Sequence, residues 1–218
     1  MTVLTVEVEA NQDDGGRGWE QSLFGMSFDN TLGTIYIGSS DSMGGDPQDT
    51  TCYFRFLDVD IPSTATINSA KLQFKLQSSH YSSGKSCRIY ADGIASSAAV
   101  TDDSEMTAIF GRLTTDYTAW DLDVSPADPD DTSSYQDSPL ITDVIDEIIN
   151  ISGWDDGDKN ITIILTDPTD ADMMESWVMS IRAHEGSGGA ITPVKLVIDY
   201  TAAGASTPTS PAFLLFLD

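Results

Sequence analysis

The chain has little positive charge, little histidine and little cysteine. Its 218 residues carry 10 Lys and Arg against 35 Asp and Glu, a formal net charge of −25, and they include 2 His and 2 Cys. Such a negative charge repels nucleic acids and anionic membrane surfaces. We therefore expect no nucleic-acid partner and no membrane partner.

Signals for export and membrane insertion are also missing. The sequence TVLTVEVEA after Met1 has no cationic stretch, and it alternates too strictly for the apolar core of a signal peptide. No apolar run approaches the roughly 20 residues that a membrane helix needs. We expect a soluble protein that is made in the cytosol.

The sequence contains no recognisable catalytic constellation. His80 and His184 are the only imidazoles, and neither lies near a nucleophile-elbow motif. The spacing of the histidines with Cys52 and Cys87 fits no standard zinc motif. Both cysteines fall on predicted inward strand positions, where we expect buried thiols, with a disulfide as the alternative. We expect no enzyme activity.

The stretch from Cys52 to Leu76 is the clearest structural signal. Two alternating runs flank the turn Ile61-Pro62-Ser63, and alternation places successive strand residues on opposite faces of a sheet. The inward positions predicted from this alternation are Cys52, Phe54, Phe56, Leu72, Phe74 and Leu76. The stretch predicts antiparallel β-sheet.

Further short alternating segments predict the other strands. They are Thr2–Glu9, Thr34–Gly38, Cys87–Ala91, Tyr117–Val124, Ile161–Thr166, Trp177–Arg182 and Val194–Thr201. The turn-rich residues Asn11 to Gly16 are predicted to separate the first strand from the next. Short strands broken by turn residues favour an all-β jelly-roll sandwich over residues 1–201.

One segment has helical rather than strand periodicity. Its apolar positions are Leu140, Ile141, Val144, Ile145, Ile148 and Ile149. Ser138 is suited to cap such a helix, and Pro139 fits its first position. We predict a single helix over about residues 139–150 that closes one end of the sandwich.

The composition changes after Tyr200. Residues 202–211 form a small, polar, proline-containing linker, and residues 212–218 read AFLLFLD. Bare apolar residues beyond a linker are an aggregation hazard. They either fold back on their own sandwich or add a strand to another subunit. The predicted partner-binding residues are Phe213, Leu214, Leu215, Phe216 and Leu217.

Acidic residues are concentrated in one region. Residues 113–158 hold thirteen Asp or Glu and no Lys, Arg or His. This region is either a solvated face that maintains solubility or a source of oxygen ligands for Ca²⁺.

These patterns together resemble the DNRLRE-like jelly-roll family, which is related to carbohydrate-binding modules and is found in bacterial surface proteins and phage-encoded proteins. The resemblance spans roughly residues 10–201. It is carried by Phe54-Arg55-Phe56, Ala65-Thr66-Ile67, Ser138-Pro139-Leu140, Gly153-Trp154 and the segment from Pro193 to Tyr200.

The resemblance implies a non-enzymatic module that binds glycans or builds a surface. It also implies a structural Ca²⁺ between the first and last strands, and the candidate ligands here are Glu7, Glu9, Asp13, Asp14 and Asp199. The alternative is that these are ordinary solvated carboxylates and turn residues.

Two aromatic residues are candidates for stacking on a sugar ring. We expect Trp120, in an acidic strand, to be exposed, with Tyr117 beside it. Trp154 is instead expected to pack at a corner between the helix and the next strand.

These observations lead to two functional hypotheses. The first is a phage virion structural protein, a capsid decoration or other exterior subunit that forms a homo-oligomer and reaches the virion exterior after cytosolic synthesis. The alternative is an extracellular carbohydrate-binding or adhesin-like module that recognises a polysaccharide.

Overall fold

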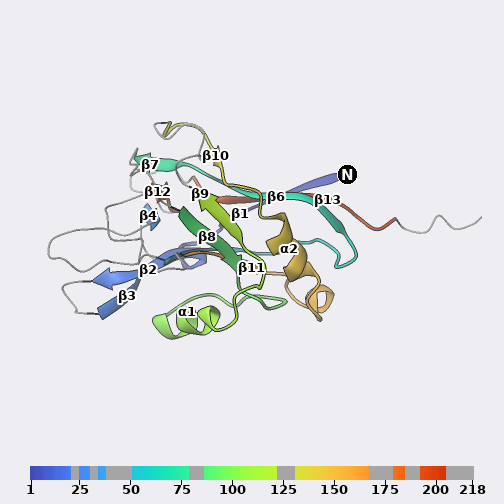
Figure 1. Ribbon diagram of the computed structural model, residues 1–218, viewed down its shortest axis with the longest axis horizontal. Helices are drawn as coiled ribbons and strands as arrows, with labels where there is room; N and C mark the ends of the chain where they lie inside the picture. Colours follow the sequence, from blue (N-terminus) through green and yellow to red (C-terminus); the bar gives the residue numbers. More distant parts are fainter. Residues whose placement is uncertain are drawn as a thin grey trace, which may run out of the picture.

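The computed structural model describes residues 1–20, 25–29, 34–37, 51–78, 86–121, 131–166, 179–184 and 192–204. Within these residues the chain is an all-β sandwich with two short α-helices, and its strands form three antiparallel sheets (Figure 1). The predicted fold class is confirmed. None of the described helices is long and apolar enough to cross a membrane.

The two larger sheets form the layers of the sandwich. The four-stranded sheet has the order β1 (Thr2–Glu7), β13 (Lys195–Thr201), β6 (Thr66–Phe74) and β10 (Gln136–Asp137). The six-stranded sheet has the order β3 (Gly25–Asp29), β2 (Asp14–Glu20), β5 (Thr51–Phe56), β11 (Ile161–Thr166), β8 (Ser86–Ala91) and β9 (Thr118–Asp121).

The third sheet extends the four-stranded layer. Its order is β4 (Thr34–Ile37), β12 (Met179–Arg182) and β7 (Leu76–Ser78). Strand β7 follows β6 after Lys75, whose carbonyl oxygen accepts a hydrogen bond from the Arg182 main-chain nitrogen at 2.9 Å.

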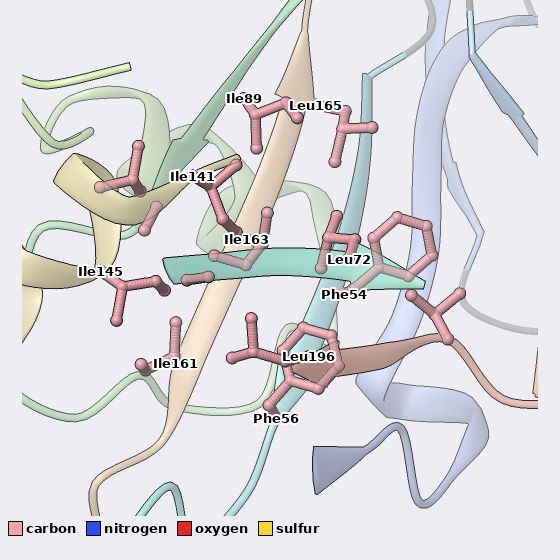
Figure 2. Packing of buried hydrophobic residues seen from close by; sticks show 14 of the residues in the cluster. Phe54, Phe56, Leu72, Ile89, Ile141, Ile145, Ile161, Ile163, Leu165 and Leu196 are labelled. Carbon is pink, nitrogen blue, oxygen red and sulfur yellow. The ribbon is translucent and has the colours of Figure 1, made fainter. Parts of the chain in front are cut away.

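The main core fills the space between the two larger sheets. Figure 2 shows Phe54, Leu72, Ile163 and Leu196 converging there from four strands, and all four side chains are buried. In strand β6 buried positions are separated by half-buried or exposed ones, as predicted. The inward positions predicted between Cys52 and Leu76 are all buried, which confirms the assignment of that stretch.

The outer face of the six-stranded sheet is covered as well. Helix α1 (Asp103–Phe110) lies beneath this sheet in Figure 1. A second buried cluster joins the helix to the sheet and consists of Tyr53, Val100, Met106, Ile109 and Ile164. All six residues of β5 are therefore buried.

The expectation of a single helix is wrong because of α1. Only Met106 and Ile109 are buried along it, so its apolar periodicity is too weak to stand out in the sequence. The sequence feature that marks the start of this helix is its N-cap residue, Asp102. The Asp102 side chain accepts a hydrogen bond from the Glu105 main-chain nitrogen at 2.9 Å.

The predicted helix over 139–150 is present but shorter, as α2 (Thr142–Ile149). The predicted capping roles of Ser138 and Pro139 are wrong, since Ile141 is the N-cap. The Ser138 hydroxyl instead accepts a hydrogen bond from the Leu72 main-chain nitrogen at 2.9 Å. Ser138 thus extends the pairing of β10 with β6. Four apolar side chains of α2 are buried, and the helix packs against β6 and β8.

Trp154 packs at a corner as predicted. It begins the short 3₁₀ helix η2 (Trp154–Asp156) after Gly153, which has a φ of 92° that favours glycine. The Trp154 ring is buried, and its Nε1 donates a hydrogen bond to the Ile61 carbonyl oxygen at 2.7 Å.

The turn predicted over Asn11–Gly16 is only partly present. The 3₁₀ helix η1 covers Asn11–Asp13, but β2 begins at Asp14 and pairs with β5. Pairing with β5 in the middle of the sheet overrides the local turn preference of Asp14, Gly15 and Gly16.

Cys52 and Cys87 are both buried and are not joined in a disulfide, so the expectation of buried thiols is confirmed. Burial raises the pKa of the Cys52 thiol well above its usual value, and the nearby Cys87 raises it further. Both thiols act as small apolar fillers of the core.

Strand β13 ends at Thr201, where the predicted domain ends. Several predictions lie outside the described residues. They concern His80, Trp177, most of the predicted linker and the apolar segment with Phe213, Leu214, Leu215, Phe216 and Leu217.

Candidate functional site: the β1 edge and its groove

Strand β1 is an edge strand in the described part of the chain. It pairs with β13 on one side, with Glu7 opposite Lys195, and no described strand pairs with its other side. The Val8 main-chain nitrogen donates to the Val194 carbonyl oxygen at 3.0 Å, which places this pair in the hydrogen-bonded class.

That bond fixes the direction of every main-chain group along β1. In an antiparallel ladder, hydrogen-bonded pairs alternate with non-hydrogen-bonded ones. Leu4 and Val6 therefore direct their N–H and C=O groups toward β13. Val3, Thr5 and Glu7 direct theirs toward the open edge, so this edge offers a row of donors and acceptors.

A groove of about 780 Å³ runs along this edge. Its lining residues are Leu4, Thr5, Val6, Glu7, Val8, Glu9, Leu57, Asp58, His184 and Pro193. Leu4 and Val6 pack against the main core but are only partly buried, so the core is incompletely covered here. The groove therefore combines main-chain hydrogen-bonding groups with apolar side chains.

Carboxylates gather at one end of the groove. Glu7, Glu9 and Asp58 all line it, and only Glu7 is paired with a described cation, with Lys195 Nζ 2.7 Å from its Oε1. This hydrogen bond raises the pKa of Lys195. The end of the groove near Glu9 is therefore negative, which disfavours an anionic ligand there.

The structure does not bring the five predicted calcium ligands together. Asp13 binds Arg55, and the Asp14 carboxylate accepts a hydrogen bond from the His184 main-chain nitrogen at 2.7 Å. Asp199 lies opposite Val3, four residues along β1 from Glu7, or about 13 Å away at the usual strand rise.

No group of three or more His, Cys, Asp or Glu side chains is placed to hold a metal ion in the described ranges. The first and last strands do pair side by side, as the predicted calcium site requires. The calcium site itself stays a prediction, and the described geometry supplies no shared ligand set for it.

The expectation that Trp120 is exposed is wrong. Its side chain is 0% exposed and packs against Phe74 across the sandwich, with ring centroids 5.5 Å apart. Trp120 lies opposite Cys87 in the β8–β9 pair, on the inward face of the sheet. The period-2 alternation of β9 makes Trp120 part of the core, where no sugar can stack on it.

Tyr117, the second predicted sugar-stacking residue, is 45% exposed. Its ring packs on Tyr90 with centroids 5.3 Å apart, and the Arg88 guanidinium lies 4.5 Å from its centroid. The Arg88 Nη1 also reaches the Tyr90 hydroxyl at 3.4 Å. Tyr117 is thus held in place on the outer face of β8, with part of its ring in solvent.

A buried polar network that the sequence analysis did not identify lies on the same outer face. Arg55 donates from Nη1 to Asp13 Oδ1 at 2.9 Å and from Nε to the Ser97 carbonyl at 3.1 Å. The Ser97 hydroxyl donates to Asp92, which also receives two hydrogen bonds from Arg112 at 2.6 and 2.9 Å.

These hydrogen bonds join the segment on both sides of α1, through Ser97 and Arg112, to the outer face of the six-stranded sheet. Asp13 and Asp92 are each 1% exposed, and both are bound by a guanidinium. Buried charges of this kind need a partner. A charged residue in an alternating strand, such as Arg55 between Phe54 and Phe56, is the sequence signal that could have revealed the network.

We predict that Arg55→Met destabilises the fold by about 3–5 kcal/mol, because Asp13 is left as a buried unpaired charge. Urea denaturation followed by tryptophan fluorescence measures the change. Lys71→Met is the matched control, because Lys71 and its partner Asp137 are partly exposed, and a loss of at most about 1 kcal/mol is expected. Equal losses in the two variants would contradict the structural role of the network.

No protein-family model and no curated protein sequence matches this chain. The DNRLRE-like resemblance therefore stays a prediction from sequence patterns, and the function rests on the chemistry of the β1 edge and of the outer sheet face.

Proposed function

We propose that the protein is a non-enzymatic structural subunit that assembles through the edge of its four-stranded sheet, as a capsid decoration or other exterior subunit of a phage virion. The observation that carries this proposal is the β1 edge, with open main-chain groups on one side and a partly apolar groove along it.

The composition of β1 supports an edge that pairs with another strand. Edge strands that avoid association usually carry lysine, proline or a bulge. Residues Thr2–Glu7 have no lysine or proline, and their pairing with β13 is continuous. Val3 is 65% exposed, so apolar surface also accompanies the open edge. Such an edge favours strand addition.

The net charge supports an exterior position. A formal charge of −25 is unfavourable next to packaged nucleic acid and keeps a surface subunit soluble before it assembles. We propose that the subunit is made in the cytosol, binds other virion subunits or copies of itself, and ends on the outside of the particle.

The apolar segment Phe213–Leu217 supports assembly through strand addition. Its five residues are all Phe or Leu. Burial of apolar surface contributes about 25 cal/mol per Å², so several such side chains make a useful anchor in addition to main-chain hydrogen bonds.

Deletion of Thr207–Asp218 is expected to abolish assembly and leave the monomer folded, because it keeps every described strand, including β13 with its core residues Leu196 and Ile198. Size-exclusion chromatography with light scattering measures the assembly state, and circular dichroism checks the fold. Full-length Thr209→Ala, which changes the linker and keeps Phe213–Leu217, is the control, and we expect it to assemble normally. An unchanged oligomer after the deletion would refute assembly through this segment.

A carbohydrate-binding function is the second candidate, and the position of Tyr117 favours it. An exposed tyrosine ring next to an arginine can stack on a sugar ring and donate hydrogen bonds to it. Tyr90 and Arg88 hold this ring on the outer face of the sheet, away from the β1 groove.

For this second candidate, Tyr117→Ala is expected to remove glycan binding on an array of neutral and acidic polysaccharides, because the stacking surface is lost. Tyr135→Ala is the control, since the Tyr135 ring lies near Lys195 of the four-stranded sheet and near Lys75 between β6 and β7. The absence of binding by the unaltered protein to every glycan on the array would count against this candidate.

A further inference from the structure

We infer that the groove along β1 receives the segment Ala212–Leu217 of a second copy of this chain, which adds to the sheet as an antiparallel strand. This inference rests on the proposed assembly function and specifies both the acceptor edge and the donor. It also specifies the direction of the added strand.

The length and chemistry of the segment fit the groove. The groove follows six consecutive residues, Leu4–Glu9, and the segment Ala212–Leu217 has six. The added strand would bond to the open main-chain groups of Thr5 and Glu7. Alternate apolar side chains of the strand would cover Leu4, Val6 and Leu57, which line the groove.

Electrostatics favour the antiparallel direction. The segment Ala212–Leu217 carries no charged side chain, and Asp218 follows it. In the antiparallel direction Asp218 lies near Thr2 and Val3, where the nearest described carboxylate, Asp199, lies one strand further away on β13 and accepts a hydrogen bond from Asn68. In the parallel direction it lies beside Glu9 and Asp58, and carboxylates placed together repel one another.

The antiparallel direction in turn favours a second copy as the donor. Tyr200 lies opposite Thr2, so β13 ends at the opposite end of β1 from Glu9. An antiparallel strand from the same chain would have to start near Glu9, about 24 Å back along β1 at the usual strand rise.

In that case the ten residues 202–211 would have to lead from the end of β13 back to Glu9, and they would also have to pass around the outside of β1. Ten residues reach at most about 35 Å when fully extended, so the return path with its detour around β1 would use most of that reach. A strand from a second copy has no such restriction.

This arrangement is heterologous, because the donor segment and the acceptor edge are different surfaces. Such contacts build closed rings or open filaments, or they close into a dimer when two copies exchange strands.

The acceptor edge is tested with the full chain and the variant Thr5→Pro. Thr5 directs its N–H group toward the open edge, so proline removes a donor for the added strand without removing a hydrogen bond to β13. We expect self-association to weaken by about tenfold or more in light scattering. Thr5→Val, which keeps the N–H group and a β-branched side chain, is the matched control and is expected to associate normally.

Cysteine pairs test the donor and the direction independently of proline. Glu9→Cys combined with Ala212→Cys is expected to give disulfide-linked dimers or higher species on a non-reducing gel. Glu9→Cys combined with Leu217→Cys, which a parallel strand would join, is expected to stay monomeric. The native Cys52 and Cys87 are buried and do not interfere.

Each outcome has a distinct meaning. Cross-linking within one chain only, or through Leu217→Cys only, overturns the inference. Full association of Thr5→Pro together with loss of association after deletion of Thr207–Asp218 overturns the β1 edge as the acceptor and leaves only assembly through the segment Phe213–Leu217 standing. Full association of both overturns the proposed assembly through this segment as well.

Discussion

The structure depends on the burial of the β5–β11 pair on both faces. One face of these strands meets the four-stranded sheet through Phe54 and Ile163, and the other meets the α1 segment through Tyr53 and Ile164. Because both faces of β5 are buried, the charge of Arg55 requires a buried partner of opposite charge. Asp13 is that partner. The sandwich, its outer helix and its buried charges therefore follow from one pair of strands.

The sequence predicts the strands well where alternation is strict, because one buried face imposes a period of two. Strand β6, Thr66–Phe74, is the example. It fails where tertiary contacts override local preference. Asp14 enters a strand despite turn chemistry, and Trp120 lies inside although its strand is acidic. The groove along β1 could not be predicted, because it depends on Leu57 and His184 from distant segments.

The two lateral sides of the sandwich are closed differently. Helix α2 packs against β6 and β8 on one side, away from β1, and buries Val144, Ile145, Ile148 and Ile149. On the opposite side β1 has no such cover among the described elements, and Leu4 and Val6 remain partly exposed. This asymmetry gives the molecule one edge where another strand can add hydrogen bonds and apolar burial together.

Hydrogen exchange at the amides of β1 tests this account most directly, because amides on the two sides of the strand have different partners. Leu4 and Val6 bond to β13 and should be protected at every protein concentration. Thr5 and Glu7 should exchange fast in the dilute monomer and become protected as the protein assembles. Fast exchange of Thr5 and Glu7 in the assembled protein would contradict strand addition at this edge.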